Sequence, residues 1–140
     1  MNVEPYLNFD GRCEEALNFY RDSIGAEIQC VMKFSDSPEP CAEGMPPGYE
    51  TKVMHSLFKV GDSALMASDC NCKGEAKFQG ISLTLNCKSD AEAEKHFAAL
   101  SQGGKVEMPM TETFFASKFG MVADKFDVSW MVLNPKPMQQ

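Results

Sequence analysis

Two amphipathic segments dominate the pattern of apolar and polar positions along the chain. In each, apolar side chains recur at the three- and four-residue spacing of one helical face. Gly25 follows the first segment and Gly103 follows the second, so we expect both helices to end before a left-handed glycine. Ser89 and Glu92 have the spacing of a capping box at the start of the second helix. The apolar positions are Cys13, Ala16, Leu17, Tyr20 and Ile24 in the first helix, and Ala93, Phe97 and Leu100 in the second.

Alternating segments predict half-buried strands, because successive side chains of a strand point to opposite faces. After the first helix, the apolar positions are Ile28, Cys30, Met32 and Phe34. Before the second helix, they are Ile81, Leu83 and Leu85, alternating with Ser82, Thr84 and Asn86.

A hairpin is predicted over HSLFKV-GD-SALMAS, with Gly61 and Asp62 as a two-residue turn. Directly paired residues share a face of the sheet. One face is the more continuously apolar, and we expect it to pack against a helix. His55 then lies on the opposite face. The predicted pairs are Val60 with Ser63, Phe58 with Leu65, Leu57 with Met66, and His55 with Ser68.

The second half of the chain repeats the first, with the extra length of the first half in a loop of four prolines at residues 35–49. Each half reads as a strand, a helix and three strands, so the sequence predicts an α+β fold of two βαβββ modules. Module 1 is expected over about residues 3–69 and module 2 over about 79–134, within one domain of residues 1–140. The aligned segments are 19–28 with 97–106, Leu7-Asn8 with Leu85-Asn86, and 62–66 with 127–131, where Leu65 matches Trp130.

The composition narrows the function classes. A formal net charge of -7 gives no basic footprint for nucleic acid. The sequence contains no apolar run of the roughly 20 residues that a membrane span needs. The N-terminal residues lack the pattern of a secretory signal, so a cytoplasmic location is the expectation.

Six cysteines are expected to be reduced thiols rather than a disulfide framework. Cys13 and Cys30 fall on apolar faces of predicted elements, where a thiol packs as a small hydrophobe. Cys70 and Cys72 lie in a polar loop, but a pair supplies only two of the four ligands of structural zinc. We therefore predict no metal role for that pair.

Three long strings resemble the PhnB-like branch of the vicinal-oxygen-chelate superfamily, which includes glyoxalase I, bleomycin-resistance proteins and extradiol dioxygenases. They are PYLNFDGRCEEALNFY, VMHSLFKVGDSALMASD and TETFFASKFGMVADKFDVSWMVLN. The resemblance implies that the two modules form a cup-shaped sheet and that the protein is a homodimer. Asp127 departs from the family pattern, because relatives usually carry glycine in the turn before the last strand.

The resemblance also implies where a metal would bind, on the first, fourth, fifth and eighth strands. Carried onto this chain, those positions fall near Glu4, Met66, Gly80 and Met131. Only Glu4 offers a ligand for a hard divalent ion, since thioethers suit soft ions such as Cu(I). We therefore predict no cofactor. An atypical site from His55, Asp69, Cys70, Cys72 and Glu112 is an alternative.

Three functions are compatible with these residues. The first is the binding of a small organic molecule in an apolar cleft, with contacts from Tyr6, His55, Met66, Asp69, Phe115 and Met131. The second is a metal-dependent lyase, isomerase or dioxygenase, with His55 as acid, base or ligand and Asp69 or Glu112 orienting it. The third is a structural or regulatory homodimer. A buried, partnered structural histidine is the alternative reading of His55. His96, in a charged helix, is expected at the surface.

A methyltransferase, the activity often attached to such sequences, gains no support, because the chain has no glycine-rich turn after a first parallel strand.

Overall fold

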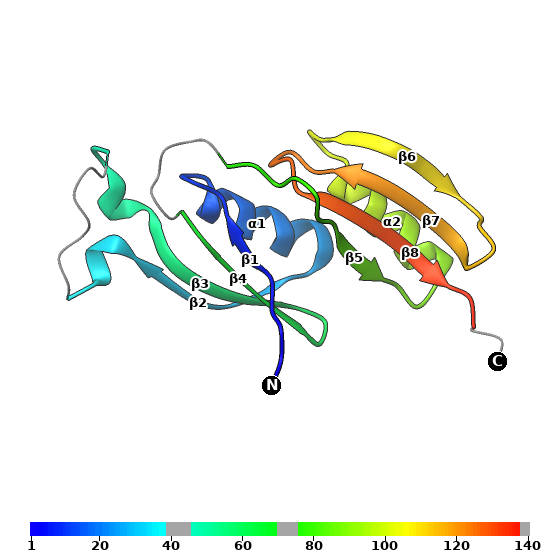
Figure 1. Ribbon diagram of the computed structural model, residues 1–140, viewed down its shortest axis with the longest axis horizontal. Helices are drawn as coiled ribbons and strands as arrows, with labels where there is room; N and C mark the ends of the chain where they lie inside the picture. Colours follow the sequence, from blue (N-terminus) through cyan, green and yellow to red (C-terminus); the bar gives the residue numbers. More distant parts are fainter. Residues whose placement is uncertain (39–45, 70–75, 138–140) are drawn as a thin grey trace. The chain divides into compact units, whose positions relative to one another are not determined.

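The computed structural model describes residues 1–38, 46–69 and 76–137. The chain divides into two compact units, Met1–Ala76 and Lys77–Gln140. Each unit contains, in chain order, a strand, an α-helix and three further strands (Figure 1). The two predicted βαβββ modules are therefore confirmed.

The first unit contains a four-stranded mixed sheet, which we call the first sheet, with the order β1-β4-β3-β2. β1 runs parallel to β4, and the other neighbours are antiparallel. Two short 3₁₀ turns flank the proline-rich loop. The elements are β1 (Tyr6–Asn8), α1 (Cys13–Ile24), β2 (Glu27–Lys33), η1 (Phe34–Asp36), η2 (Tyr49–Thr51), β3 (Val53–Val60) and β4 (Ser63–Ser68).

The second unit repeats this topology in the second sheet, with the order β5-β8-β7-β6. β5 runs parallel to β8, and β6 and β8 each run antiparallel to β7. The elements are β5 (Leu83–Asn86), α2 (Asp90–Leu100), β6 (Lys105–Thr111), β7 (Ala116–Ala123) and β8 (Ser129–Pro135).

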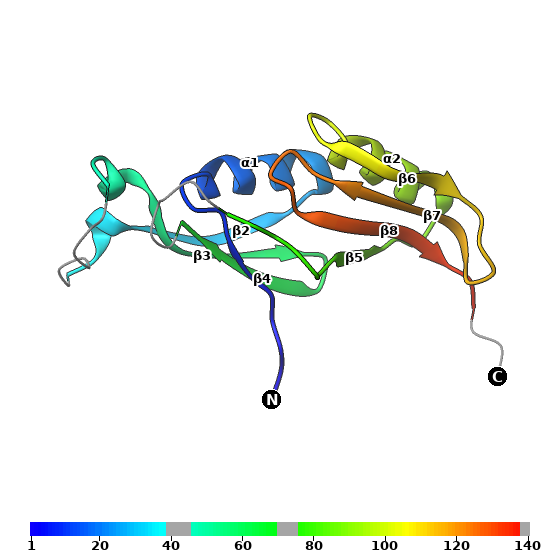
Figure 2. The same ribbon diagram turned by 45° about the horizontal axis from the view of Figure 1, so that its top comes forward.

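In each unit the helix lies across one face of its sheet (Figures 1 and 2). Phe58 of β3 pairs with Leu65 of β4, and its ring stacks on Tyr20 of α1 with centroids 6.1 Å apart. In the second unit, Gly120 of β7 lies so close to Phe97 of α2 that a Cβ would meet the ring at 2.7 Å. The buried core therefore lies between each helix and its sheet, as the alternation predicted.

Among the described residues, no helix of the same unit lies against the opposite face of each sheet, and we call that face the open face. The hairpin pairs Val60–Ser63 and Leu57–Met66 occur as predicted, with Gly61 in the turn at φ 58°. Because Leu57 alternates with Phe58, Leu57 and Met66 lie on the open face.

The helix boundaries follow the sequence signals closely. α1 buries the five predicted positions and ends at Gly25, which is left-handed at φ 70°. At the start of α2, the Ser89 hydroxyl accepts from the Glu92 N–H at 3.1 Å, as half of a capping box. The Glu92 carboxylate accepts from the Lys88 N–H instead of closing the box on Ser89.

Some predicted burial was wrong. Phe34 lies in the 3₁₀ turn η1, beyond the end of β2. Cys30 is exposed, because β2 is an edge strand with a register shift between Ile28 and Cys30. The extra residue of such a bulge turns the following side chains to the other face. Ile81 lies before β5 and is 59% exposed. The side chain of His96, expected at the surface, is only 18% exposed and lies beside Glu92.

Asp127 occupies a turn position that favours glycine. The turn from Asp124 to Val128 is closed by the Asp124 N–H, which donates to the Val128 carbonyl at 2.9 Å. Within it Asp127 has a left-handed φ of 67°. Residues with a Cβ are strained in this region, although Asp tolerates it better than most. The departure from the family pattern therefore has a local conformational cost.

We expect Asp127→Gly to raise the free energy of unfolding by about 0.5–1 kcal/mol, because glycine adopts this φ without strain. Urea denaturation followed by circular dichroism measures it. Asp62→Gly is the matched control, since the φ of Asp62 is not left-handed and glycine there only loosens the unfolded chain. If Asp127→Gly lowers the free energy of unfolding as much as Asp62→Gly does, Asp127 is not strained in the native turn.

Candidate functional site

The open face of the first sheet brings together three of the predicted site residues. Tyr6 is the register partner of Met66, and Met66 is the partner of Leu57. His55 lies two residues from Leu57 on the same strand and therefore on the same face. Met32 of β2 is the register partner of His55. Tyr6, His55 and Met66 thus share one surface, which is half-buried to exposed.

Tyr6 and His55 form a direct side-chain pair. The Tyr6 hydroxyl lies 3.2 Å from Nδ1 of His55, and the two ring centroids are 5.8 Å apart. The hydroxyl can donate to a neutral ring or accept from a protonated Nδ1. In both cases the bond fixes the imidazole and leaves Nε2 for another partner. Sequence reasoning proposed Asp69 or Glu112 as the orienting group, whereas the structure places Tyr6 there.

Asp69 is buried at 1% exposure and holds three parts of the first unit together. Its Oδ1 accepts from the N–H groups of Gly11 and Cys13 at 2.7 and 2.8 Å. Its Oδ2 accepts from the Val53 N–H at 2.8 Å. The carboxylate thus joins the N-terminus of α1 to the start of β3, where the helix dipole favours negative charge. These contacts favour a structural role, and the predicted ligand contact of Asp69 stays a prediction.

We expect Asp69→Asn to lower the free energy of unfolding by about 2–3 kcal/mol, because the amide cannot accept all three bonds and places a donor against buried N–H groups. Chemical denaturation measures the change.

Asp62→Asn serves as the control for that substitution. Asp62 is exposed in the hairpin turn, and we expect a change within about 0.5 kcal/mol. Equal effects at the two positions would contradict the role assigned to Asp69.

In the second unit, different side chains connect the end of the fourth strand to the start of the helix. Asn134, 65 residues after Asp69, lies near the end of β8, whereas Asp69 directly follows β4, and this is the offset that relates Trp130 to Leu65. The Asn134 amide donates to the Asp90 carboxylate at 3.0 Å and lies 3.1 Å from the Ser117 hydroxyl, which also donates to Asp90. These two bonds hold the pKa of Asp90 below its usual value.

The open face of the second sheet carries the counterparts of the first. Met131 pairs with Thr84 and Met121, as Met66 pairs with Tyr6 and Leu57. Met121 and Met131 pack against an apolar cluster that consists of Ala116, Phe119 and Leu133. Phe115, 40% exposed, contacts Phe119 with ring centroids 5.2 Å apart.

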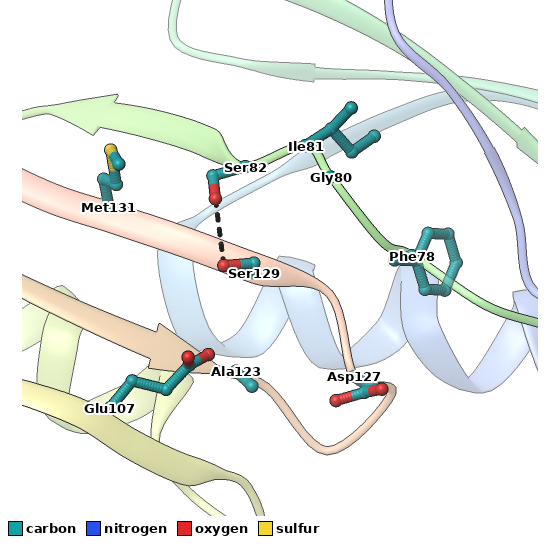
Figure 3. Close-up of a pocket in the computed structure, with 9 residues that line it drawn as sticks. All are labelled: Phe78, Gly80, Ile81, Ser82, Glu107, Ala123, Asp127, Ser129 and Met131. Carbon is teal, nitrogen blue, oxygen red and sulfur yellow. Dashed lines mark hydrogen bonds between the residues drawn. The ribbon is translucent and has the colours of Figure 1, made fainter.

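A groove of about 550 Å³ lies in the second unit beside Met131 (Figure 3). A hydrogen bond of 3.0 Å from the Ser82 hydroxyl to the Ser129 hydroxyl crosses from the β5 side to β8. Glu107 and Asp127 contribute carboxylates. The lining residues are Phe78, Gly80, Ile81, Ser82, Glu107, Ala123, Asp127, Ser129 and Met131.

Of the predicted site residues, Met131 lines this groove, whereas its polar residues were not predicted. Ser82 was interpreted only as the polar half of an alternating strand, and Glu107 carried no motif. The sequence signal that existed was the repeat, which aligned residues 127–131 with residues 62–66 as equivalent positions. Phe115, also predicted, contacts Phe119 of the apolar cluster and is not among the residues that line this groove.

The positions expected from the family for a divalent metal do not fit such an ion here. Glu4 and Gly80 lie before β1 and β5, and the strand neighbours of Met66 and Met131 are Tyr6 and Thr84. Within residues 1–38, 46–69 and 76–137, no three His, Cys, Asp or Glu side chains are grouped for metal binding.

The other members of the alternative metal site are placed as follows. Glu112 forms an ion pair of 2.9 Å with Lys136, which lowers the pKa of the Glu112 carboxyl. Cys70 and Cys72 lie outside the described residues.

The buried thiols are held in the protonated form. Burial is the main reason that the pKa of Cys13 is raised to about 12 and that of Cys87 to about 11. A thiol reacts and binds metals as the thiolate, so burial favours a structural role for both residues. Cys30, by contrast, is exposed on β2.

No helix among the described residues has the length and apolar character that a membrane crossing requires.

Known proteins are similar to this chain over almost its whole length. Residues 1–133 match the family described as 3-demethylubiquinone-9 3-methyltransferase. Protein YjdN of Escherichia coli (strain K12) is 36% identical over 147 residues, which cover 99% of this chain and 100% of that protein.

Solved structures also match almost the whole chain. Protein PA1353 from Pseudomonas aeruginosa is 41% identical, with a TM-score of 0.83 over 96% of this chain and 97% of that one. A putative 3-demethylubiquinone-9 3-methyltransferase, PhnB protein, from Bacillus cereus is 28% identical, with a TM-score of 0.77 over 96% of this chain and 99% of that one.

A glyoxylase/bleomycin resistance protein/dioxygenase domain from Frankia sp. EAN1pec, 11% identical, has a TM-score of 0.63 over 96% of this chain and 95% of that one and shares the fold. The chain therefore belongs to the PhnB, or 3-demethylubiquinone-9 3-methyltransferase, family and has a glyoxalase-like fold.

Proposed function

For this PhnB-like protein, we propose the binding of a small organic molecule in the groove of the second unit. The observation that carries the proposal is the size and lining of that groove beside Met131. Its volume of about 550 Å³ falls in the range of sites for small molecules. Phe78, Ile81 and Met131 supply the apolar part.

The polar groups of the groove favour a ligand that donates hydrogen bonds. Glu107 and Asp127 are exposed carboxylates that only accept, and the Ser82 hydroxyl already donates to the Ser129 hydroxyl. Methionine adapts its shape to irregular apolar ligands. We therefore propose a ligand with an apolar, preferably aromatic, body and an N–H or O–H donor.

The methyl transfer in the family description is supported less well than binding. A cofactor-binding strand–turn–helix presents its backbone N–H groups to the cofactor. In this chain the corresponding turn after β1 directs the N–H groups of Gly11 and Cys13 at the Asp69 carboxylate. S-adenosylmethionine is therefore a useful negative probe, for which the proposal expects no saturable binding.

A library of aromatic amines and phenols, followed by ¹H–¹⁵N correlation spectra of the assigned protein, tests the proposal. We expect hits to shift the amides of Ser82, Glu107, Ser129 and Met131 together. Met131→Ala is expected to weaken the hits about tenfold, or about 1.4 kcal/mol, because part of a thioether contact is lost.

Met66→Ala, the equivalent position in the first unit, is the matched control and is expected to leave these affinities unchanged. Glu107→Gln keeps the shape of the groove and should weaken amines more than phenols. The proposal fails if hits shift other surfaces only, or if Met66→Ala weakens them as much as Met131→Ala.

An enzymatic function is the second candidate, and the Tyr6–His55 pair favours it. A histidine fixed through Nδ1 can exchange a proton at Nε2 with a substrate. If the protein turns over the hemithioacetal of methylglyoxal and glutathione, we expect His55→Ala to lower kcat/KM about 10²–10⁴-fold. His96→Ala, which alters the other histidine, is the control. Full activity in His55→Ala would exclude this role.

A homodimer, expected from the family resemblance, is a further proposal. Exposed apolar side chains on the edge strands support it, namely Val31 and Met32 on β2 and Val106 and Met108 on β6.

A further inference from the structure

Soft donor atoms gather on the open face of the first sheet. Met32 of β2 and His55 of β3 are register partners. Met66 of β4 is the partner of Leu57, two residues along β3 from His55 on the same face. Cys30, the β2 partner of Leu57, is exposed on that face as well. Two thioethers, one imidazole and one thiol thus occupy three adjacent strands.

The register brings these side chains within reach of one another. Directly opposed residues have Cβ atoms about 4.5–5.5 Å apart, and diagonal neighbours lie at about 7–8 Å. Met32 is opposed to His55, and Met66 is diagonal to it. Methionine has three rotatable bonds, so both sulfurs can approach the imidazole from neighbouring strands. Met32 is 38% exposed and His55 and Met66 are half-buried, so an ion has access from solvent.

Tyr6 orients the His55 imidazole as a second partner orients the histidine ligands of metal sites. Its hydroxyl lies 3.2 Å from Nδ1 of His55, which directs Nε2 to an outside partner. Histidines that bind metals commonly donate their second ring N–H to a fixed acceptor, which sets the tautomer and the ring orientation. Tyr6 supplies that acceptor here.

We propose that Met32, His55 and Met66 bind a soft monovalent metal ion of the Cu(I) class, with Cys30 as a neighbouring fourth donor. Thioether and thiolate sulfur select Cu(I), whereas Mg²⁺, Ca²⁺ and Mn²⁺ prefer oxygen ligands. The direct and diagonal neighbours of His55 on β2 and β4, Met32 and Met66, offer thioether sulfur, whereas a hard ion would need carboxylates. The site involves only residues of the first unit, and it is independent of the groove in the second.

In the metal-bound form Nε2 of His55 is a ligand. Metal binding and acid–base catalysis by His55 are therefore alternative uses of the same atom. The groove ligand and the ion are tested on different residues, so one proposal can fail without the other.

Ag(I), which has the ligand preference of Cu(I) and does not change oxidation state, is the probe. The full chain is labelled with ¹³C at the methionine methyl groups and titrated under anaerobic conditions, past saturation of its six cysteines. We expect the methyl signals of Met32 and Met66 to shift with one midpoint, together with the ring signals of His55. The signals of Met121 and Met131, on the second sheet, should remain in place.

Single substitutions separate binding from folding. Met32→Leu and Met66→Leu preserve volume and should each weaken the site about tenfold or more, as should His55→Ala. Tyr6→Phe keeps the ring but removes the hydroxyl, and loss of such an outer partner typically lowers metal affinity 10–100-fold. Met121→Leu is the matched control and should have no effect. Circular dichroism confirms that each variant is folded.

Three results would overturn the assignment. The first is that the methyl signals of Met32 and Met66 do not shift at saturating Ag(I). The second is that the Met121 methyl signal shifts as much as theirs. The third is that His55→Ala and Met66→Leu both bind Ag(I) with unchanged affinity. Zn²⁺ and Mn²⁺ are run in parallel, and preferential binding of either ion at these residues would also contradict a soft-ion site.

Discussion

The fold of each unit depends on a junction at which the fourth strand ends against the N-terminus of the helix and the start of the third strand. In the first unit one buried carboxylate, that of Asp69, makes this junction with three backbone N–H groups. Hydrogen bonds to a charged group contribute about 1.5–3 kcal/mol each, and an unmade one leaves a buried donor unpaired. The junction fixes the helix on one face of the sheet, and the other face remains open.

The second unit makes the same junction with exchanged roles. Asp90 at the start of α2 is the acceptor, and Asn134 and Ser117 supply the donors. In both units the residue three positions before the strand-end partner is a methionine on the open face, Met66 or Met131. The repeated architecture therefore places equivalent side chains on two surfaces, and these surfaces have diverged. One carries the Tyr6–His55 pair among sulfur atoms, and the other carries a groove with carboxylates.

Much of the fold could be predicted from the sequence, because its signals are local. The helical faces, Gly25 and the Gly61 turn depend on spacing within a few residues, and each occurs as predicted. The exposure of Cys30 could not be predicted, because it depends on a bulge and on the edge position of β2.

The site was less accessible to sequence reasoning. The pairing of Tyr6 with His55 joins residues 49 apart in the chain through a diagonal across three strands, which alternation alone does not specify. The same applies to Glu107 and Ser82, which only the folded second unit brings together. From the sequence, Asp69 was predicted to contact a ligand. In the structure its carboxylate accepts hydrogen bonds from three backbone N–H groups.

Residue-resolved hydrogen exchange of the native protein tests the junction most directly. The amides of Gly11, Cys13 and Val53 all donate to Asp69, so they should exchange only when the whole first unit unfolds. Their free energies of exchange should therefore equal those of the central strands β3 and β4. Exchange of these amides at free energies well below those strands would show that the junction opens locally, and would contradict the account that the fold depends on it.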